Sequence, residues 1–291
     1  MTFCKNRSRL IPELDWAAVE NAEGFVFLGC GGVNSQLIAQ LSREGLGRKG
    51  ITVIDPDRIE ESDLGRNAIA LPVDVGLPKV DVIADFRALL GLPTRTLARA
   101  LANAFVEDLK DEDVSLIIDA TDTDLSRLQA AITARERGCP ILHVGAGVTF
   151  EASRRVAGGQ VLFHDPREKS SGCIICADAL DLEKAEEQSL THRQRELRRR
   201  AGYLVDLPEQ PTPMVGHLAA VIAGVAAELV CNFLLHGRAP SSLHAFSLDE
   251  LRLVEANVPR SPTCPLCAPR LTAAAGTSQL PPAKHIAQGS K

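Results

Sequence analysis

The sequence lacks a net positive charge, a P-loop lysine motif and an apolar run at its start. Its 32 Lys and Arg residues stand against 37 Asp and Glu residues, and the net charge of -5 gives no general attraction to nucleic acid or to an anionic membrane. The opening MTFCKNRSRL has basic side chains with no apolar run behind them, so we expect no secretory signal and a cytoplasmic protein. No internal repeat is present. A hydrophobic content of 45% nevertheless allows a sizeable core.

Apolar runs alternate with amphipathic stretches over the first half of the chain. Buried strands are predicted at GFVFLGC, GITVIDPD, VSLIIDATD and PILHVGAGVTF, a further strand at TRTLARA, and helices at NSQLIAQLSREGLG, residues 79–90 and LSRLQAAITARERG. This order predicts an α/β fold with a Rossmann-like, mostly parallel sheet and flanking helices. Beyond residue 150, VAGGQVLFHDP predicts an antiparallel extension. Residues 1–23 are expected to form an N-terminal arm with a short helix, and residues 269–291 a disordered tail.

Residues 214–235, MVGHLAAVIAGVAAELVCNFLL, form an apolar run that is long enough to span a bilayer. His217 and Glu228 interrupt the run, and its small residues suit close packing inside a protein. Because ionisable groups inside lipid are expensive, we favour a buried core or dimer-interface helix over a membrane span. We therefore expect no membrane partner.

Residues 181–200, DLEKAEEQSLTHRQRELRRR, change from acidic to basic along the segment. A solvated helix or a mobile loop, with charges that match the helix dipole, is the favoured interpretation. The alternative is a binding patch made by Arg193, Arg195 and residues 198–200.

The stretch FVFLGCGGVNSQL predicts a strand, a glycine turn and the start of a helix. Gly29, Gly31 and Gly32 let the backbone approach a phosphate closely, and the helix offers free N–H groups and the positive end of its dipole. No GK[ST] follows, so the turn is not a P-loop. A dinucleotide fingerprint would place its third glycine at position 34, where this chain has Asn34.

Charged residues follow the next two strands that the sequence predicts. Asp55 ends one of them, where a carboxylate typically accepts hydrogen bonds from the ribose of NAD or ATP. The later members of this set are Asp57, Asp63, Arg66, Asn67, Lys79, Asp119 and Asp122. Two fixed cations can neutralise the phosphates of ATP while charge builds up on pyrophosphate, and an acid can hold Mg²⁺. A hydride-transfer enzyme has no need for this set, so nucleotidyl transfer is favoured over an NAD-dependent oxidoreductase.

The motifs GCGG, DPD, SDLGRN, GLPK and ATDT occur in the order and with the spacing of the ThiF/MoeB/E1 superfamily, which the chain resembles over roughly residues 20–268. Members of this superfamily are ATP-dependent activators of ubiquitin-like and sulfur-carrier proteins. The resemblance implies an adenylation domain at residues 24–268, with a crossover segment at about residues 177–213. It also implies a homodimer in which an N-terminal arginine, here Arg9 or Arg7, reaches the ATP of the partner.

The resemblance implies a role for each matched residue. Asp55 would bind the ribose with Asp57 beside it, Arg66 and Lys79 would act on the phosphates, and Asp122 would hold Mg²⁺. The full ATP-binding set predicted is Gly29, Gly31, Gly32, Asn34, Asp55, Asp57, Arg66, Lys79 and Asp122, with Arg9 in trans. Three residues depart from the pattern: Asn34 replaces a usual Gly, and Asp63 and Thr123 each replace a usual Asn. Each change is small and polar, so we expect the site to survive.

Two CxxC pairs stand out among eight cysteines, namely Cys173 and Cys176 in SGCIICA and Cys264 and Cys267 in TCPLCAP. Without a secretory signal, reduced thiols and metal are favoured over disulfides. The pairs can close one tetrahedral Cys₄ zinc site, and because such a site leaves no position for water, the zinc should be structural. In the family that the chain resembles, this site ties the crossover segment to the C-terminal end.

Conjugating members of the family carry a nucleophilic cysteine in the crossover segment, but residues 177–213 contain none. Tyr203 and Leu204 stand about where it would be. The four remaining cysteines are Cys30 in the glycine loop, Cys139 and Cys231 in predicted core positions, and Cys4, which nothing marks as activated. The sequence therefore supports adenylation and not thioester formation.

The favoured function is an E1-like adenylyltransferase that uses Mg-ATP to adenylate the C-terminal carboxylate of a ubiquitin-like or sulfur-carrier protein and releases pyrophosphate. An E2-like protein or a sulfur donor would then accept the acyl group. One alternative is an E1-like enzyme that acts on a peptide or tRNA carboxylate, although the net charge of -5 disfavours nucleic acid. The other is a nucleotide-binding pseudo-E1 that serves as a regulatory partner.

Overall fold

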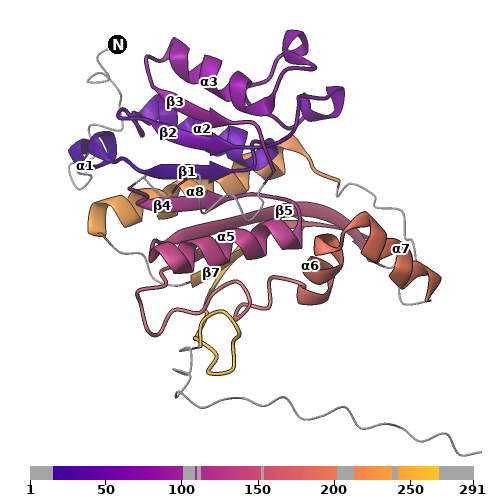
Figure 1. Cartoon of the computed structure of the whole chain (residues 1–291). Helices are drawn as coiled ribbons and strands as arrows, with labels where there is room; N and C mark the ends of the chain where they lie inside the picture. The colour runs from indigo at the N-terminus through magenta and orange to yellow at the C-terminus, as the bar shows by residue number, and fades with distance from the viewer. Residues whose placement is uncertain are drawn as a thin grey trace, which may run out of the picture.

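A computed structural model describes residues 16–100, 109, 113–151, 154–201, 213–237 and 242–268. It confirms the predicted fold class: one eight-stranded sheet, in the order β3-β2-β1-β4-β5-β6-β7-β8, with helices on both faces (Figure 1). Arg7, Arg9, Cys4, Tyr203, Leu204 and the tail at 269–291, all named in the predictions above, lie outside the described residues.

The first half of the sheet is parallel. Its strands are β1 (Phe25–Leu28), β2 (Ile51–Ile54), β3 (Thr94–Leu97), β4 (Leu116–Asp119) and the start of β5 (Ile141–Glu151). Leu28 at the end of β1 is paired with Ile54 of β2 on one side and with Asp119 of β4 on the other. The loops that follow these three strands therefore meet at one edge of the sheet, which is where open α/β sheets bind their ligands.

The second half of the sheet is antiparallel and consists of β6 (Arg154–His164), β7 (Ser242–Ser247) and β8 (Arg252–Asn257) next to β5. The sequence predicted a strand at β6 and a general antiparallel extension, but not β7 and β8 themselves. All six residues of β8 are exposed. A strand without a buried face carries no alternation of apolar and polar residues, so its sequence gave no signal.

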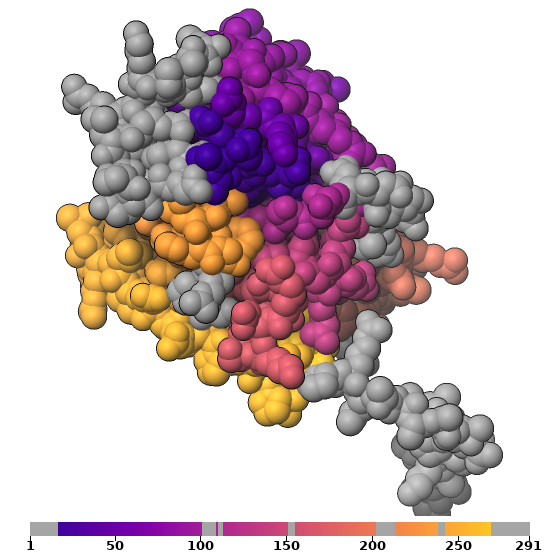
Figure 2. Space-filling view, turned by 90° about the vertical axis from the view of Figure 1, so that its left-hand side faces the viewer, coloured from indigo at the N-terminus to yellow at the C-terminus, as the bar shows by residue number. Residues whose placement is uncertain are grey.

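Helices cover the two faces of the sheet. α2 (Gly32–Glu44) and α8 (Gly216–His236) pack together on one face, and α5 (Asp124–Arg137) lies on the other (Figure 1). Two short 3₁₀ turns, η3 (Glu61–Asp63) and η4 (Pro72–Asp74), follow β2 in the chain. The next helix, α3 (Lys79–Leu89), packs against β3. α1 (Trp16–Asn21) contacts α8, and Figure 2 shows the indigo N-terminal segments beside the orange segment that holds α8.

The long apolar run forms α8, which the sequence analysis predicted as a buried core or dimer-interface helix, and one side of it packs in the core. Leu218, Ile222, Ala226 and Val230 are buried in the main hydrophobic cluster together with side chains of α2 and the sheet. Within the described ranges, α8 is the one helix whose length and composition would allow it to cross a membrane, and 44% of its most apolar window is buried.

The charged segment at 181–200 folds into two helices, α6 (Leu182–Ser189) and α7 (His192–Arg200). Thr191 caps the second helix, since its hydroxyl accepts a hydrogen bond from the N–H of Gln194. Ion pairs join Arg198 to Glu186 at 2.8 Å and Arg200 to Glu196 at 2.9 Å. The favoured prediction of a solvated helix is confirmed, with a break that the sequence analysis did not place.

Candidate functional site

The glycine turn connects the end of β1 to the start of α2. Gly29 has a φ of 79°, and a Cβ on it would lie 3.0 Å from the carbonyl oxygen of Ala120, so both its conformation and its neighbour require glycine. Gly31 is the N-cap of α2, and a Cβ built on it would meet nothing within 4 Å. The space in front of the loop is therefore open, and the unpaired N–H groups of the first turn of α2 suit a phosphate there.

Asp55, at the end of β2, fastens the glycine loop to the loop that follows β2. One carboxylate oxygen accepts a hydrogen bond from the N–H of Cys30, and the other accepts one from the N–H of Asp57 at 2.7 Å. Burial raises the pKa of Asp55, although these backbone donors and Lys79 oppose that rise. Asp55 thus holds the two loops together from a buried position. Its binding to a ribose stays a prediction.

Lys79 is the first residue of α3, and its side chain turns back towards the acids that follow β2. Its Nζ lies 3.2 Å from Oδ2 of Asp57 and 3.7 Å from Oδ2 of Asp63, and the residue is only 8% exposed. Burial lowers the pKa of Lys79, but the carboxylates of Asp55, Asp63 and Asp57 outweigh it and the net pKa is raised. The site therefore holds a protonated amine beside the open glycine loop.

Asp63 joins the two predicted phosphate cations. Its Oδ1 accepts a hydrogen bond from Nη2 of Arg66 at 2.7 Å, while its Oδ2 accepts one from the N–H of Glu60 at 3.0 Å and faces Lys79. Asp63 is 1% exposed, whereas the side chain of Arg66 remains 30% exposed. Asp63 was predicted as one of the charged residues of the site and as a departure from the family pattern, but without a contact to either cation. The spacing of three residues to Arg66, within a helical turn, was the signal that could have identified the pair.

Asn34, predicted among the ATP-binding residues, lies beneath the glycine loop. It is fully buried, and its Nδ2 donates hydrogen bonds to the carbonyl oxygens of Leu28 at 2.9 Å and Gly29 at 2.7 Å. Its Oδ1 has no hydrogen-bond partner among the described residues. The structure thus gives Asn34 a position that supports the backbone of the loop, not one on its open side.

The position of Asn34 predicts that two substitutions destabilise the protein to different extents. Asn34→Ala removes two hydrogen bonds and should lower the free energy of unfolding by about 2 kcal/mol. Asn34→Asp places an acceptor against two carbonyl oxygens in a buried site, so it should be clearly more destabilising than Asn34→Ala. Urea denaturation of the three proteins measures this difference. Equal stability of the two variants would show that the amide does not donate to these carbonyl groups.

Asp119 is the last residue of β4 and Asp122 lies in the loop after it, and the two acids differ in their surroundings. Asp119 is buried, and its carboxylate accepts hydrogen bonds from the N–H and the hydroxyl of Thr121 at 3.0 and 2.7 Å. Asp122 is exposed at the start of α5, and Thr123, the departure from the usual Asn, caps that helix through the N–H of Ser126. Of the two acids, Asp122 is therefore the one that is accessible to a metal ion.

The edge of the sheet thus gathers an open glycine loop, two cations held by carboxylates, and an exposed acid on the neighbouring strand end. Residues 6–266 match the model of the ThiF family. The chain belongs to the ThiF family. The match covers the predicted adenylation domain as far as residue 266, and with it three of the four paired cysteines, Cys173, Cys176 and Cys264.

Curated relatives of this ThiF-family protein carry related names. The chain is 24% identical over 281 residues to the sulfur carrier protein adenylyltransferase of Thermus thermophilus, which covers 90% of this chain and 89% of the relative. It is 31% identical over 129 residues to the SAMP-activating enzyme E1 of Haloferax volcanii, covering 43% and 46% of the two chains. It is 29% identical over 117 residues to the tRNA threonylcarbamoyladenosine dehydratase of Bacillus subtilis, covering 40% and 45%.

Solved structures of Escherichia coli MccB share the fold. MccB with MccA-N7isoASN superposes with a TM-score of 0.66 at 19% identity, covering 87% of this chain and 69% of MccB. MccB with ATP superposes with a TM-score of 0.64 at 20% identity, covering 87% and 68%. At these identities the likeness concerns the architecture alone.

The four cysteines of the two CxxC pairs come together at the end of the ThiF-family domain. The Sγ atoms of Cys173, Cys176, Cys264 and Cys267 all lie within 4.8 Å of one another. Cys173 Sγ is 3.6 Å from that of Cys264 and 4.0 Å from that of Cys176. A tetrahedral zinc ion with Zn–S bonds of about 2.3 Å requires sulfur atoms about 3.8 Å apart. The donor set and its spacing therefore fit a structural zinc ion.

The cysteines outside this cluster that the structure describes are poor nucleophiles. Burial raises the pKa of Cys139 to about 11 and, with Glu44 and Glu228 nearby, that of Cys231 to about 12. Cys30 is fully buried and its pKa is also raised, by burial first and by Asp55 second. None of these three thiols has the depressed pKa of an activated cysteine.

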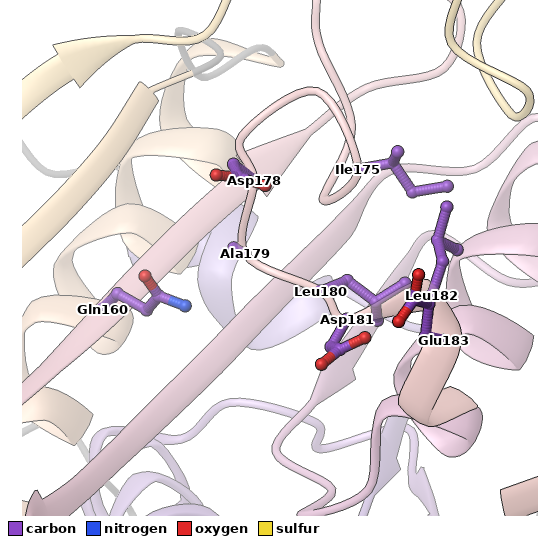
Figure 3. Close-up of a pocket in the computed structure, with 8 residues that line it drawn as sticks. All are labelled: Gln160, Ile175, Asp178, Ala179, Leu180, Asp181, Leu182 and Glu183. Atoms are coloured by element: carbon purple, nitrogen blue, oxygen red, sulfur yellow. The ribbon is translucent and has the colours of Figure 1, made fainter. Parts of the chain in front are cut away.

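A separate surface pocket of about 670 Å³ lies at the start of the crossover segment. Figure 3 shows Gln160 on a strand at one side and Asp178, Asp181 and Glu183 on the chain that runs past it. None of the predicted ATP-binding residues lines this pocket. It is therefore distinct from the glycine-loop site.

Proposed function

We propose that this ThiF-family protein uses Mg-ATP to adenylate the C-terminal carboxylate of a small ubiquitin-like or sulfur-carrier protein. One observation supports the proposal above all: Asp63 holds both Arg66 and Lys79 beside a glycine loop whose front is open. Two fixed cations at a helix N-terminus are the arrangement that a polyphosphate needs.

In the proposed reaction a carboxylate oxygen of the carrier attacks the α-phosphorus of ATP. A new carboxylate–phosphorus bond forms, the bond from the α-phosphorus to the bridging oxygen of the β-phosphate breaks, and its electron pair leaves with pyrophosphate. Arg66 and Lys79 neutralise the charge that builds up on the leaving group. The exposed Asp122 would hold Mg²⁺, which supplies further charge neutralisation.

The proposed partners follow from the relatives. The sulfur carrier protein adenylyltransferase of Thermus thermophilus matches almost the whole chain, which supports a small carrier protein as the substrate. Since the described thiols outside the zinc cluster are buried or partly buried and not activated, an E2-like protein or a sulfur donor would supply the accepting thiol. We further propose a cytoplasmic homodimer, in which Arg9 of one chain serves the ATP of the other.

The test is ATP–pyrophosphate exchange that depends on a ubiquitin-like protein ending in Gly-Gly. Asp122→Ala should lower the exchange rate at least about 100-fold, because Mg²⁺ would lose the carboxylate proposed to hold it. Asp85→Ala, which removes an exposed carboxylate from α3, is the matched control and should exchange normally. Full exchange by Asp122→Ala would remove Asp122 from the metal site.

A tRNA carboxylate is the second candidate substrate. The relative named tRNA threonylcarbamoyladenosine dehydratase and the exposed arginines of α7 favour it. However, Arg198 and Arg200 are already paired with Glu186 and Glu196, which reduces their attraction for phosphates. Exchange that is stimulated by tRNA and not by the carrier would select this candidate. Tight ATP binding without exchange under either condition would indicate a pseudo-E1.

A further inference from the structure

A buried histidine lies directly behind the loop that carries Asp122. His143 is on β5, next to β4, and its Nδ1 is 2.7 Å from Oδ2 of Asp119. Both side chains are almost completely buried, at 3% and 1% exposure. Hydrogen bonds from His143 and Thr121 and the charges of His143 and Arg127 oppose burial and lower the pKa of Asp119. Asp119 is therefore an ionised acceptor, and Nδ1 of His143 must be the donor.

The same carboxylate shapes the loop after β4. Its other oxygen, Oδ1, accepts hydrogen bonds from both the N–H and the hydroxyl of Thr121, the residue before Asp122. Arg127 on α5 adds a third support, since its Nε donates to the carbonyl oxygen of Thr121 at 2.9 Å. The chain of contacts therefore runs from His143 through Asp119 and Thr121 to the predicted metal acid.

The imidazole of His143 is not explained by packing. Its Nε2 is buried without a hydrogen-bond partner among the described residues. Such an orphaned polar atom destabilises a protein by about 1–3 kcal/mol, and an apolar side chain of similar volume would avoid that penalty. The one polar contact of His143 in the described structure is the bond to Asp119, so this bond is the feature that distinguishes it from an apolar core residue.

We propose that His143 is a positioning residue for the magnesium site. By donating Nδ1–H to Asp119 it fixes the carboxylate that holds Thr121, and thereby sets the direction in which Asp122 faces the nucleotide. The inference rests on the proposed function, because it takes Asp122 as the metal ligand. Residues that orient metal ligands through hydrogen bonds typically change metal affinity 10- to 100-fold when they are removed.

Two substitutions separate the hydrogen bond from simple packing. His143→Asn keeps an N–H donor at the place of Nδ1, whereas His143→Leu fills the volume without a donor. The matched control is His164→Leu, because His164 is a 4% exposed histidine on the adjacent strand β6 that bonds Ser171 instead of Asp119. Circular dichroism and thermal unfolding check that each variant is folded.

The first readout is the Mg²⁺ dependence of ATP binding, measured by calorimetry. His143→Leu should raise the Mg²⁺ concentration for half-maximal binding about tenfold, while His143→Asn and His164→Leu should stay within about twofold of the wild type. The second readout is the proton NMR spectrum. A downfield imidazole N–H resonance is expected in the wild type and in His164→Leu, and it should disappear in His143→Leu and in Asp119→Asn.

Equal Mg²⁺ dependence of His143→Leu and the wild type would overturn the proposal, as would a His143→Asn variant that is as weak as His143→Leu. A wild type that does not bind Mg-ATP would overturn it together with the proposed function. Failure of pyrophosphate exchange alone would count only against the proposed function, because neither readout needs a carrier or turnover.

Discussion

Lys79→Met is expected to reduce ATP–pyrophosphate exchange by about 100- to 1,000-fold, the loss that typically follows removal of one fixed donor to transition-state charge. The methionine side chain can occupy the buried path of the lysine stem, but it leaves Asp55, Asp57 and Asp63 without the cation between them. Their carboxylates would then repel the phosphates that Lys79 attracts. ATP binding should therefore weaken, and formation of the acyl-adenylate should slow.

The matched control for this prediction is Lys49→Met. Lys49 forms an exposed ion pair with Glu23 at 3.2 Å. It precedes β2, whereas the candidate site follows the ends of β1, β2 and β4, so its loss should leave exchange unchanged. Exchange is measured with each variant at saturating carrier, and unfolding midpoints are compared in parallel. A Lys79→Met enzyme within tenfold of the wild type would remove Lys79 from the catalytic set.

The raised pKa of Lys79 fixes the sign of its pH dependence. Its contribution to stability is fully present below the unfolded value of about 10.4 and is lost as the pH rises through the higher folded value. Between pH 6 and 9, a profile of exchange should therefore show no titration of this amine.

Cys264→Ser is expected to remove zinc and to cause the largest loss of stability. The cysteine cluster joins the chain after β6 to the chain after β8, two segments that also share the β-bridge between Ser171 and Pro259. Structural zinc contributes about 10–16 kcal/mol to the folding of zinc-finger peptides. Even a fraction of that energy exceeds the effect of a typical core substitution.

Metal content and unfolding together test the zinc prediction. Elemental analysis should find one zinc ion per wild-type chain and almost none in Cys264→Ser, whose unfolding midpoint should fall sharply. Cys231→Ser, which changes a partly buried thiol of α8, should keep its zinc and lose little stability. If Cys264→Ser retained both zinc and the wild-type midpoint, the Cys₄ site would be wrong.

The sequence predicted the parallel half of the sheet because each of its central strands is a buried apolar run. It also predicted α3 at Lys79, where the structure begins that helix. β7 and β8 were missed because β7 is only partly buried and β8 is exposed throughout, so neither shows the pattern of a core strand. Propensity and periodicity report burial, and a strand that adds to an edge need not be buried.

For the candidate site, too, one part could be predicted from the sequence and another could not. The acids at the ends of β2 and β4 could be predicted to lie at one edge of the sheet, because both strands run parallel to β1 between them. Their separate roles could not. Asp119 differs from Asp122 because β5 places His143 against it, and Asp63 joins two cations because α3 brings Lys79 back to it. Both distinctions depend on neighbours that are distant in sequence.

Two glycines limit how this chain can vary around Arg66. A Cβ on Gly32, the first residue of α2, would lie 3.2 Å from the Arg66 side chain, and a Cβ on Gly216, the first residue of α8, would lie 2.7 Å from the carbonyl oxygen of Gly65. Gly65 and Arg66 therefore pack between the first residues of α2 and α8. A larger residue at 32 would push on the Arg66 side chain, and one at 216 would clash with the backbone before Arg66, so two positions without a functional group help to fix where the cation stands.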